Sequence, residues 1–258
     1  MTGGGGILGR GFCRVLAEHG ARVAVLDVAA AAADATVAAI RADLPSSELL
    51  SVVCNVADPA SVAGAVDRVV AAFGGVHVLH NNAASKSADL ARFFDAFEDY
   101  RLATWREVMS VNIDGMFLMA QAVGRQMLRQ GSGGSIVQTA SIYGVVAPDQ
   151  RIYEGSEYGG RPINTPAVYS ASKAAVLGLT RYLAAYWGDK GIRVNGLTPG
   201  GVDSGQNEVF SRRYSARVPL GRMARADEMQ SALLFLASDA SSYVTGQNIV
   251  VDGGLSCW

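Results

Sequence analysis

The sequence has few of the residues that would mark a secreted, membrane-bound or nucleic-acid-binding protein. Only three cysteines, Cys13, Cys54 and Cys257, occur among 258 residues, and their odd number and wide spacing favour neither disulfides nor a metal site. No apolar run is long enough for a transmembrane helix, and the first residues do not resemble a signal peptide. The 22 Lys and Arg are balanced by 23 Asp and Glu and are not clustered, which argues against nucleic acid or a membrane as partner. We therefore expect a soluble, cytoplasmic globular protein.

Hydrophobic residues are abundant, at 50% of the chain, and their arrangement predicts an α/β fold. Short apolar runs alternate with stretches of helical periodicity, such as 60–73 and 104–128, and the near-continuous apolar runs are typical of strands buried on both faces. This alternation predicts one Rossmann-like, doubly wound parallel sheet with helices on both faces. No linker divides the chain, so we expect a single domain over 1–258. The expected strands are 21–27, 49–56, 76–83, 134–141, 192–199 and 247–253.

A glycine run near the first residue suggests a phosphate-binding turn. Thr2, Gly3, Gly6 and Gly9 fit T-G-x-x-G-x-x-G, and Gly4, Gly6 and Gly9 also fit G-x-G-x-x-G. Glycines at such a turn let the backbone approach a pyrophosphate, which then faces a helix N-terminus. A flexible glycine-rich tail is the alternative explanation.

Asp27 favours the dinucleotide interpretation. It ends the strand expected at 21–27, where a carboxylate can bind the ribose hydroxyls of a dinucleotide. Val28 and Ala29 follow, so no arginine is present there to bind a 2′-phosphate, and NAD is favoured over NADP. The alternative is an aspartate that caps the next helix.

Several further motifs occur in a characteristic order. They are NNAA (81–84), VN (111–112), Ser141 with YSASK (169–173), RVNGLTPGGV (193–202) and VTGQNIVVDGG (244–254). Together they resemble the short-chain dehydrogenase/reductase family over nearly the whole chain. The resemblance implies NAD(P)-dependent hydride transfer between nicotinamide and a secondary alcohol or ketone, in a homotetramer or homodimer.

The residue types at the expected site suit this chemistry. A phenol has an ordinary pKa near 10, too high for a base at neutral pH, but a nearby ammonium and the positive nicotinamide ring stabilise the phenolate. Tyr169 and Lys173 are four residues apart and share a helix face. Tyr169 is thus the expected acid/base, and a serine hydroxyl can stabilise the substrate oxygen. By resemblance, Ser141 has that role, and Asn112 seats a water in the proton path.

The resemblance also implies a set of cofactor-binding residues. Three positions depart from the family pattern: Ile7 replaces a glycine usual in shorter members, Asn55 replaces an aspartate near the adenine, and Ala84 replaces the last glycine of N-N-A-G. The expected cofactor-binding residues are Gly3, Gly6, Ile7, Leu8, Gly9, Asp27, Asn55, Val56, Asn82, Ala83, Tyr169, Lys173, Pro199, Gly200, Val202 and Ser204.

A second Y-x-x-x-K occurs at Tyr186 and Lys190. Gly188 and Gly191 suggest that the helix ends there, so we interpret Tyr186 as a packing aromatic and Lys190 as a surface lysine. Tyr169 instead begins a helix of small residues that can approach a cofactor closely.

The segment between Ser141 and Tyr169 is about twice as long as is usual in the family. We expect the insertion, 145–167, to form a loop over the active-site mouth, where Arg151, Tyr153 and Arg161 form part of a polar wall. Such a wall suits a small-molecule substrate that is a sugar or polyol derivative, with a phosphate or carboxylate for an arginine to bind. An oligomer contact or an inert surface loop is the alternative. Lys86, in the segment after NNAA, is expected to help form the wall.

The family's first strand, which lies mid-sheet, has no counterpart before Thr2. Each unpaired backbone group left in the core would cost ~1–3 kcal/mol. We expect the sequence to begin late, or another segment or a partner chain to fill the gap.

Two rival functions are kept. The first is a biosynthetic reductase of a 3-ketoacyl group or ring ketone, which Asp27 disfavours because such reductases more often use NADPH. The second is a dinucleotide-binding relative without turnover, which the complete set of Ser141, Tyr169 and Lys173 disfavours.

Overall fold

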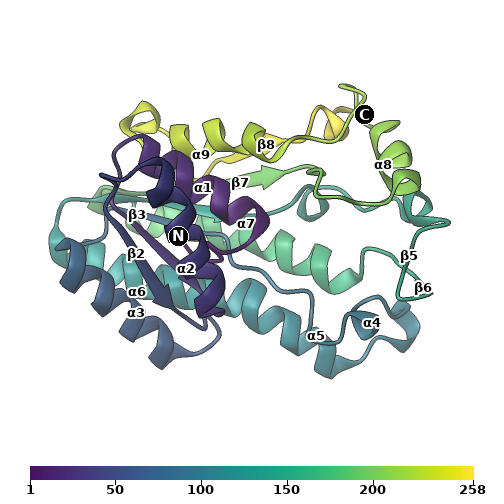
Figure 1. Cartoon of the computed structure of the whole chain (residues 1–258), viewed down its shortest axis with the longest axis horizontal. Helices are drawn as coiled ribbons and strands as arrows, with labels where there is room; N and C mark the ends of the chain where they lie inside the picture. Colours follow the sequence, from purple (N-terminus) through teal and green to yellow (C-terminus); the bar gives the residue numbers. More distant parts are fainter.

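The computed structural model describes residues 1–258, and all six expected strands form in it (Figure 1). Their apolar, β-branched sequences bury most of their side chains, and every pairing among them is parallel. The strands are β1 (Val23–Asp27), β2 (Leu49–Val53), β3 (Val78–Asn81), β4 (Gly134–Thr139), β7 (Ile192–Pro199) and β8 (Asn248–Val251). The predicted α/β class is confirmed.

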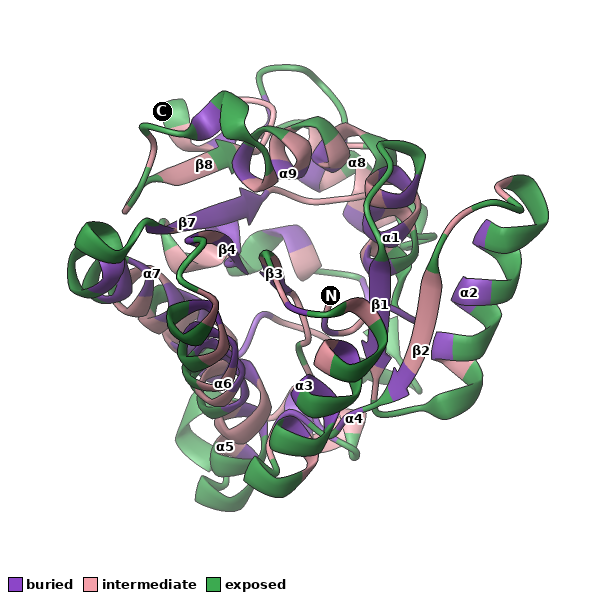
Figure 2. Cartoon of the chain, turned by 90° about the vertical axis from the view of Figure 1, so that its left-hand side faces the viewer, coloured by how far each residue is buried: buried purple, intermediate pink, exposed green.

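Helices cover both faces of the sheet. In Figure 2, α1, α2 and α9 lie on one side and α3, α6 and α7 on the other. The helix expected over 104–128 is instead two helices, because a π-helical turn at Ser110–Asp114 separates α5 from α6. The helices are α1 (Ile7–Glu18), α2 (Ala30–Asp43), α3 (Pro59–Phe73), α4 (Leu90–Phe93), α5 (Leu102–Met109), α6 (Gly115–Gln130), α7 (Ala167–Trp187), α8 (Glu208–Ser215) and α9 (Gln230–Ala237). None of them is long and apolar enough to span a membrane.

The parallel ladder is interrupted between β1 and β3. One sheet has the order β1-β2 and the other β3-β4-β7-β8. Met1 and Thr2 lie between them: the Leu26 amide donates to the Met1 carbonyl (2.9 Å), and the Thr2 amide donates to the His80 carbonyl (3.0 Å). Two residues thus connect the sheets at their carboxyl ends, beside an apolar cavity of about 300 Å³.

The expected insertion has local structure of its own. A 3-10 turn at Gln150–Tyr153 precedes a short antiparallel hairpin of β5 (Glu157–Tyr158) and β6 (Arg161–Pro162). Buried Ile152 packs with Phe210 and Tyr214 of α8. The insertion and α8 therefore lie together at one end of the molecule, beside the carboxyl ends of β4 and β7 (Figure 1).

Candidate active site

The glycine turn at the start of the chain is built for close approach of a phosphate group. Gly3 has a φ of 62°, and a Cβ there would lie 2.9 Å from the Cα of Ala83. Helix α1 begins at Ile7 after Gly6, and no side chain caps it. Its first amides are therefore free to bind an anion. The turn fits the pyrophosphate of a dinucleotide.

Thr2 and Asn82 brace this turn. The Thr2 hydroxyl accepts hydrogen bonds from the amides of Asn82 (2.9 Å) and Ala83 (3.0 Å). The Asn82 side-chain amide donates to the Thr2 carbonyl (3.3 Å). These contacts join the end of β3 to the turn, so two motifs 80 residues apart form one wall of the site.

Asp27 lies at the carboxyl end of β1, at the rim of the same cavity. Its carboxylate accepts hydrogen bonds from the amides of Gly5 (3.0 Å) and Ala29 (3.1 Å). The N-cap residue of α2 is Ala29, and no side chain caps that helix. The alternative interpretation, in which Asp27 is the N-cap of the next helix, is therefore wrong. Two backbone donors fix the carboxylate where a ribose would lie.

A cavity of about 620 Å³ extends from the glycine turn to Tyr169. Every cofactor-binding residue expected from the sequence lines it except Ser204. Sequence reasoning missed several further lining residues, because backbone positions next to a motif carry no signal of their own. These are Val28, Cys54, Ser85, Val111, Thr139 and Ala140, whereas Ala84 and Lys86, both named from the sequence, line it as well.

Ser141 and Tyr169 meet at the inner end of this cavity. Ser141 follows β4, and Tyr169 stands in the first turn of α7. Burial raises the pKa of Tyr169 above its ordinary value, and a hydrogen bond with Ser141 partly offsets this effect. The Ser141 Oγ also accepts from the Tyr143 amide (3.3 Å), which holds the serine in place.

Lys173 lies one turn further along α7 and is almost fully buried, at 2% exposure. Its Nζ donates to the Thr139 carbonyl (2.9 Å), and no carboxylate pairs with it. Burial lowers the pKa of Lys173 from 10.5 to about 8. The Thr139 side chain in turn hydrogen-bonds His80 Nε2 (2.7 Å), so β3 supports the strand that holds the lysine.

Asn112 lies in the π-helical turn, a feature that often marks functional sites. Its Nδ2 donates to Ser172 Oγ (3.3 Å), and that hydroxyl donates to the Tyr169 carbonyl (2.8 Å). Its Oδ1 accepts from the Ser85 amide (2.8 Å). Asn112 is fully buried and does not line the cavity, so it reaches the site through α7 and the loop after β3.

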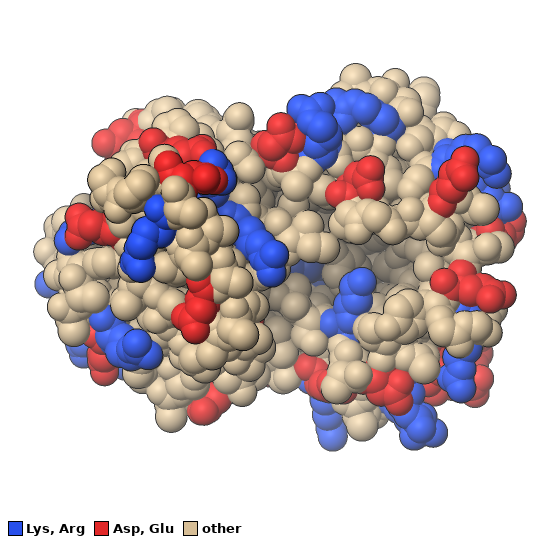
Figure 3. All heavy atoms as spheres, in the orientation of Figure 1, with Lys and Arg blue, Asp and Glu red and all other residues tan.

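A second cavity, of about 360 Å³, adjoins the first at Ser141, Tyr169, Gly200 and Lys86. Its walls combine Phe93, Phe94 and Ile142 with hydroxyl and amide side chains, and Tyr153 of the insertion is among them. Figure 3 shows the molecule hollowed between the side that carries α1 and α2 and the side that carries α8 and the hairpin. Ser141 and Tyr169 thus stand between a larger cavity and a smaller one.

Family comparison agrees with this geometry. The short chain dehydrogenase family matches residues 1–156, and the family described as enoyl-(acyl carrier protein) reductase matches residues 154–256. The chain belongs to the short chain dehydrogenases. It is 38% identical to D-threitol dehydrogenase of Mycolicibacterium smegmatis, over 98% of this chain and 90% of the relative.

Two solved structures of this family are also similar. A gluconate 5-dehydrogenase from Burkholderia cenocepacia J2315, in complex with NADP and tartrate, is 32% identical with a TM-score of 0.86, covering 100% of this chain and 94% of that one. An NAD+-bound xylitol dehydrogenase is 31% identical with a TM-score of 0.85, covering 98% and 96%. Enzymes of this fold therefore bind either nicotinamide dinucleotide, and the chain is an oxidoreductase that acts on CH–OH groups.

Three expected residues of this short chain dehydrogenase lie away from the cavities. Arg151 pairs with Asp149 (2.7 Å) and its side chain is 83% exposed, because the 3-10 turn buries its neighbour Ile152. Arg161 is exposed on the hairpin. Ser204 lies in an exposed turn, where its amide donates to Gln206 Oε1 (2.8 Å). The two arginines and Ser204 are corrections to the expected site.

The structure also separates the two Y-x-x-x-K sequences. Tyr186 is exposed and stacks on Tyr182, with ring centroids 5.8 Å apart, and Lys190 pairs with Asp189. Neither residue reaches a cavity. In this short chain dehydrogenase, Tyr169 and Lys173 are the pair of the two that lines the larger cavity.

Proposed function

We propose that this chain is an NAD-dependent dehydrogenase of polyols and related sugars. The observation that carries the proposal is the junction at which Ser141 and Tyr169 face both cavities, one shaped for a dinucleotide and the other for a small polar molecule. We also propose that residues 1–258 form a single dinucleotide-binding domain and that the protein acts in the cytoplasm.

The chain's own residues supply the acid/base chemistry. The Ser141 hydroxyl holds the substrate oxygen, and the Tyr169 phenolate removes its proton as the C–H bond breaks. Lys173, when charged, stabilises the phenolate. The residues that line the larger cavity would hold NAD, which would supply the hydride acceptor, so that loss of a proton and a hydride would convert the alcohol carbon to a carbonyl. Asn112 keeps the backbone of Tyr169 in place through Ser172.

The choice of NAD rests on Asp27. A carboxylate fixed by two backbone amides can accept hydrogen bonds from both ribose hydroxyls, whereas the 2′-phosphate of NADP would meet its negative charge. No basic residue follows in the chain, since Val28 and Ala29 stand next.

The choice of a polyol rests on the second cavity. Its polar wall includes Tyr153, Asn164 and Asn207, which can exchange hydrogen bonds with several hydroxyls. Its apolar side, with Phe93 and Phe94, suits the C–H surface of a carbon chain. The D-threitol and xylitol dehydrogenases among the relatives support this substrate class.

We also propose a homodimer or homotetramer that assembles through α6 and α7. Phe117 of α6 and the stacked pair Tyr182 and Tyr186 of α7 are each about half or more exposed. Large exposed aromatics on adjoining helices are typical of protein interfaces.

The test is NAD reduction by the purified chain with xylitol, D-threitol and galactitol. We expect turnover with at least one of them, and Tyr169→Phe should lower kcat by ~10²–10⁴ with little change in the KM for NAD. The matched control is Tyr186→Phe, in the second Y-x-x-x-K, which should keep full activity. Equal activity of Tyr169→Phe and the wild type would refute the proposed chemistry.

The same assay tests cofactor choice. The wild type should prefer NAD to NADP, and Asp27→Ala should narrow that preference by about tenfold or more through a higher KM for NAD. A wild type that prefers NADP would contradict the role given to Asp27.

A further inference from the structure

Lys86 stands where the two cavities meet. It lines both of them, as do Ser141, Tyr169 and Gly200. The 19 residues around the second cavity include no Asp, Glu or Arg, so Lys86 is the one charged side chain there. A group bound in that cavity with its reacting carbon at Tyr169 therefore lies within reach of the Lys86 ammonium.

The loop that carries Lys86 is held in a strained form. Ser87 has a φ of 123° and is the only residue other than glycine with positive φ. The Glu107 carboxylate accepts from the Ser87 hydroxyl (2.9 Å) and the Ala88 amide (2.7 Å), while Ser85 is tied to Asn112 (2.8 Å). Strain of this kind persists when surrounding contacts over-determine it, and it is common at ligand-binding sites.

The Lys86 ammonium has no carboxylate partner in the structure. No ion pair in the structure includes Lys86. The carboxylates near the insertion pair with arginines instead: Asp149 with Arg151 and Glu154 with Arg213. Lys86 lines the second cavity, which contains none of the glycine-turn residues, so a ligand bound in that cavity meets Lys86 at a site separate from the pyrophosphate turn. The charge is thus available to a substrate anion.

We propose that Lys86 binds a carboxylate of the substrate, so that the enzyme prefers polyhydroxy acids of the sugar-acid class to neutral polyols of the same length. This rests on the proposed function and names the preferred substrate within it. In this proposal Lys86, and not Arg151 or Arg161 as expected from the sequence, binds the anionic group of the substrate.

The experiment compares D-gluconate with D-glucitol as substrates with NAD. The two share their carbon chain and hydroxyl configuration and differ only in a carboxylate against a CH₂OH group. For Lys86→Gln, we expect the ratio of kcat/KM for D-gluconate to that for D-glucitol to fall about ten- to hundredfold. Lys86→Arg should keep most of the ratio, and Arg151→Gln, an exposed cation outside both cavities, should keep all of it.

A second readout does not depend on turnover. In the presence of NAD, D-gluconate should raise the melting temperature of the wild type more than D-glucitol does, and Lys86→Gln should remove that difference. Added salt should weaken the D-gluconate effect in the wild type alone. Lys86 is exposed, so its replacement leaves the core intact.

Two results would overturn the proposal. If Lys86→Gln lowers kcat/KM equally for both substrates, the lysine does not read a carboxylate; if it raises the KM for NAD, the lysine belongs to the cofactor site. The proposed function fails differently: the wild type would then reduce NAD with neither these compounds nor the neutral polyols, whatever residue stands at 86.

Discussion

Among single residues, Lys173 combines a proposed catalytic role with a burial that opposes folding when its side chain is charged. The ammonium is almost fully buried with one carbonyl partner, and its pKa falls from 10.5 to about 8. Because the folded state disfavours the charged form, the cost is complete below pH 8 and disappears as the pH rises toward 10.5. Stability therefore increases with pH across this window.

We predict that Lys173→Met stabilises the protein at neutral pH while abolishing most activity. The pKa difference corresponds to ~3 kcal/mol in the free energy of unfolding at pH 7, and the gain should be much smaller at pH 10. Urea denaturation of wild type and variant at both pH values measures it. The control is Lys190→Met, an exposed lysine, which should change little. A Lys173→Met variant less stable than the wild type at pH 7 would show that the charge is stabilised in the fold.

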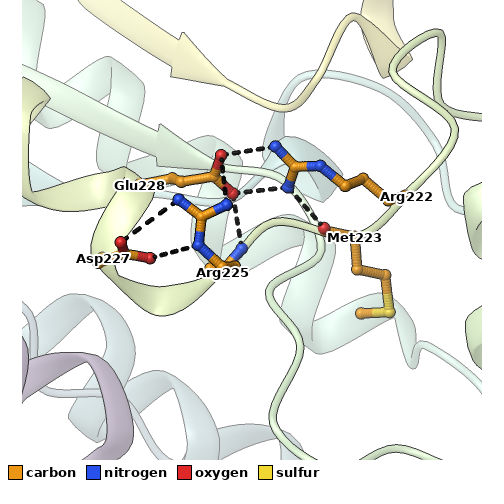
Figure 4. Close-up of polar contacts among 5 residues, drawn as sticks. All are labelled: Arg222, Met223, Arg225, Asp227 and Glu228. Carbon is orange, nitrogen blue, oxygen red and sulfur yellow. Dashed lines mark hydrogen bonds and ion pairs between the residues drawn. The ribbon is translucent and has the colours of Figure 1, made fainter.

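At the scale of elements, an ion-pair network fastens the connection between α8 and α9. The Glu228 carboxylate accepts from both Arg222 nitrogens (2.6 and 2.7 Å) and from the Arg225 amide (2.8 Å). Arg222 also donates to the Met223 carbonyl (3.1 Å) (Figure 4), and the Met223 side chain lines the second cavity. The network thus fixes one wall of the second cavity, the proposed substrate site.

We predict that Glu228→Gln raises the KM for the polyol several-fold with kcat changed by less than about twofold, because it loosens substrate binding and not the chemistry. The Arg222 hydrogen bonds lower the pKa of Glu228 to about 2. Its contribution is therefore complete above the ordinary carboxyl range near pH 4.5 and is lost as the pH falls toward 2. Asp227→Asn is the control, since Asp227 contacts only the exposed Arg225 side chain. If KM rose equally for both variants, the contacts of Glu228 would not be what holds the cavity wall in place.

At the scale of the whole molecule, the helices on opposite faces have different tasks. Helix α1 carries the cofactor turn, whereas α7 carries Tyr169 and Lys173 on its inner side and Tyr182 and Tyr186 on its outer side. Assembly through α7 would support the catalytic pair from behind. The proposed oligomer therefore has a direct structural link to activity.

We predict that Tyr182→Arg shifts the protein to a smaller assembly, because the two new arginines, one from each copy, would be buried without a partner at a two-fold contact between copies of α6 and α7. Sedimentation of wild type and variant at the same concentration measures this. The control is Tyr243→Arg, at an exposed aromatic outside both helices. A wild type that sediments as a monomer would refute the proposed assembly.

The sequence was enough to recognise the family and to predict the α/β class and the strands along the chain. Periodicity placed Asp27, Ser141, Tyr169 and Lys173 at strand ends or on one helix face, and the resemblance to the family supplied their proposed roles. The glycine turn was also predictable, because only glycine readily adopts the positive φ that Gly3 has in this turn.

Which charged side chains face the two cavities depends on contacts that form only in the folded chain. Arg151 and Lys86 both lie in irregular segments whose direction no periodicity encodes. Packing of Ile152 against α8 turns Arg151 outward, and the Glu107 clamp holds the Lys86 loop at the cavity junction. Side-chain direction in a loop depends on contacts with residues far away in sequence, and these exist only once the sheet has brought the segments together.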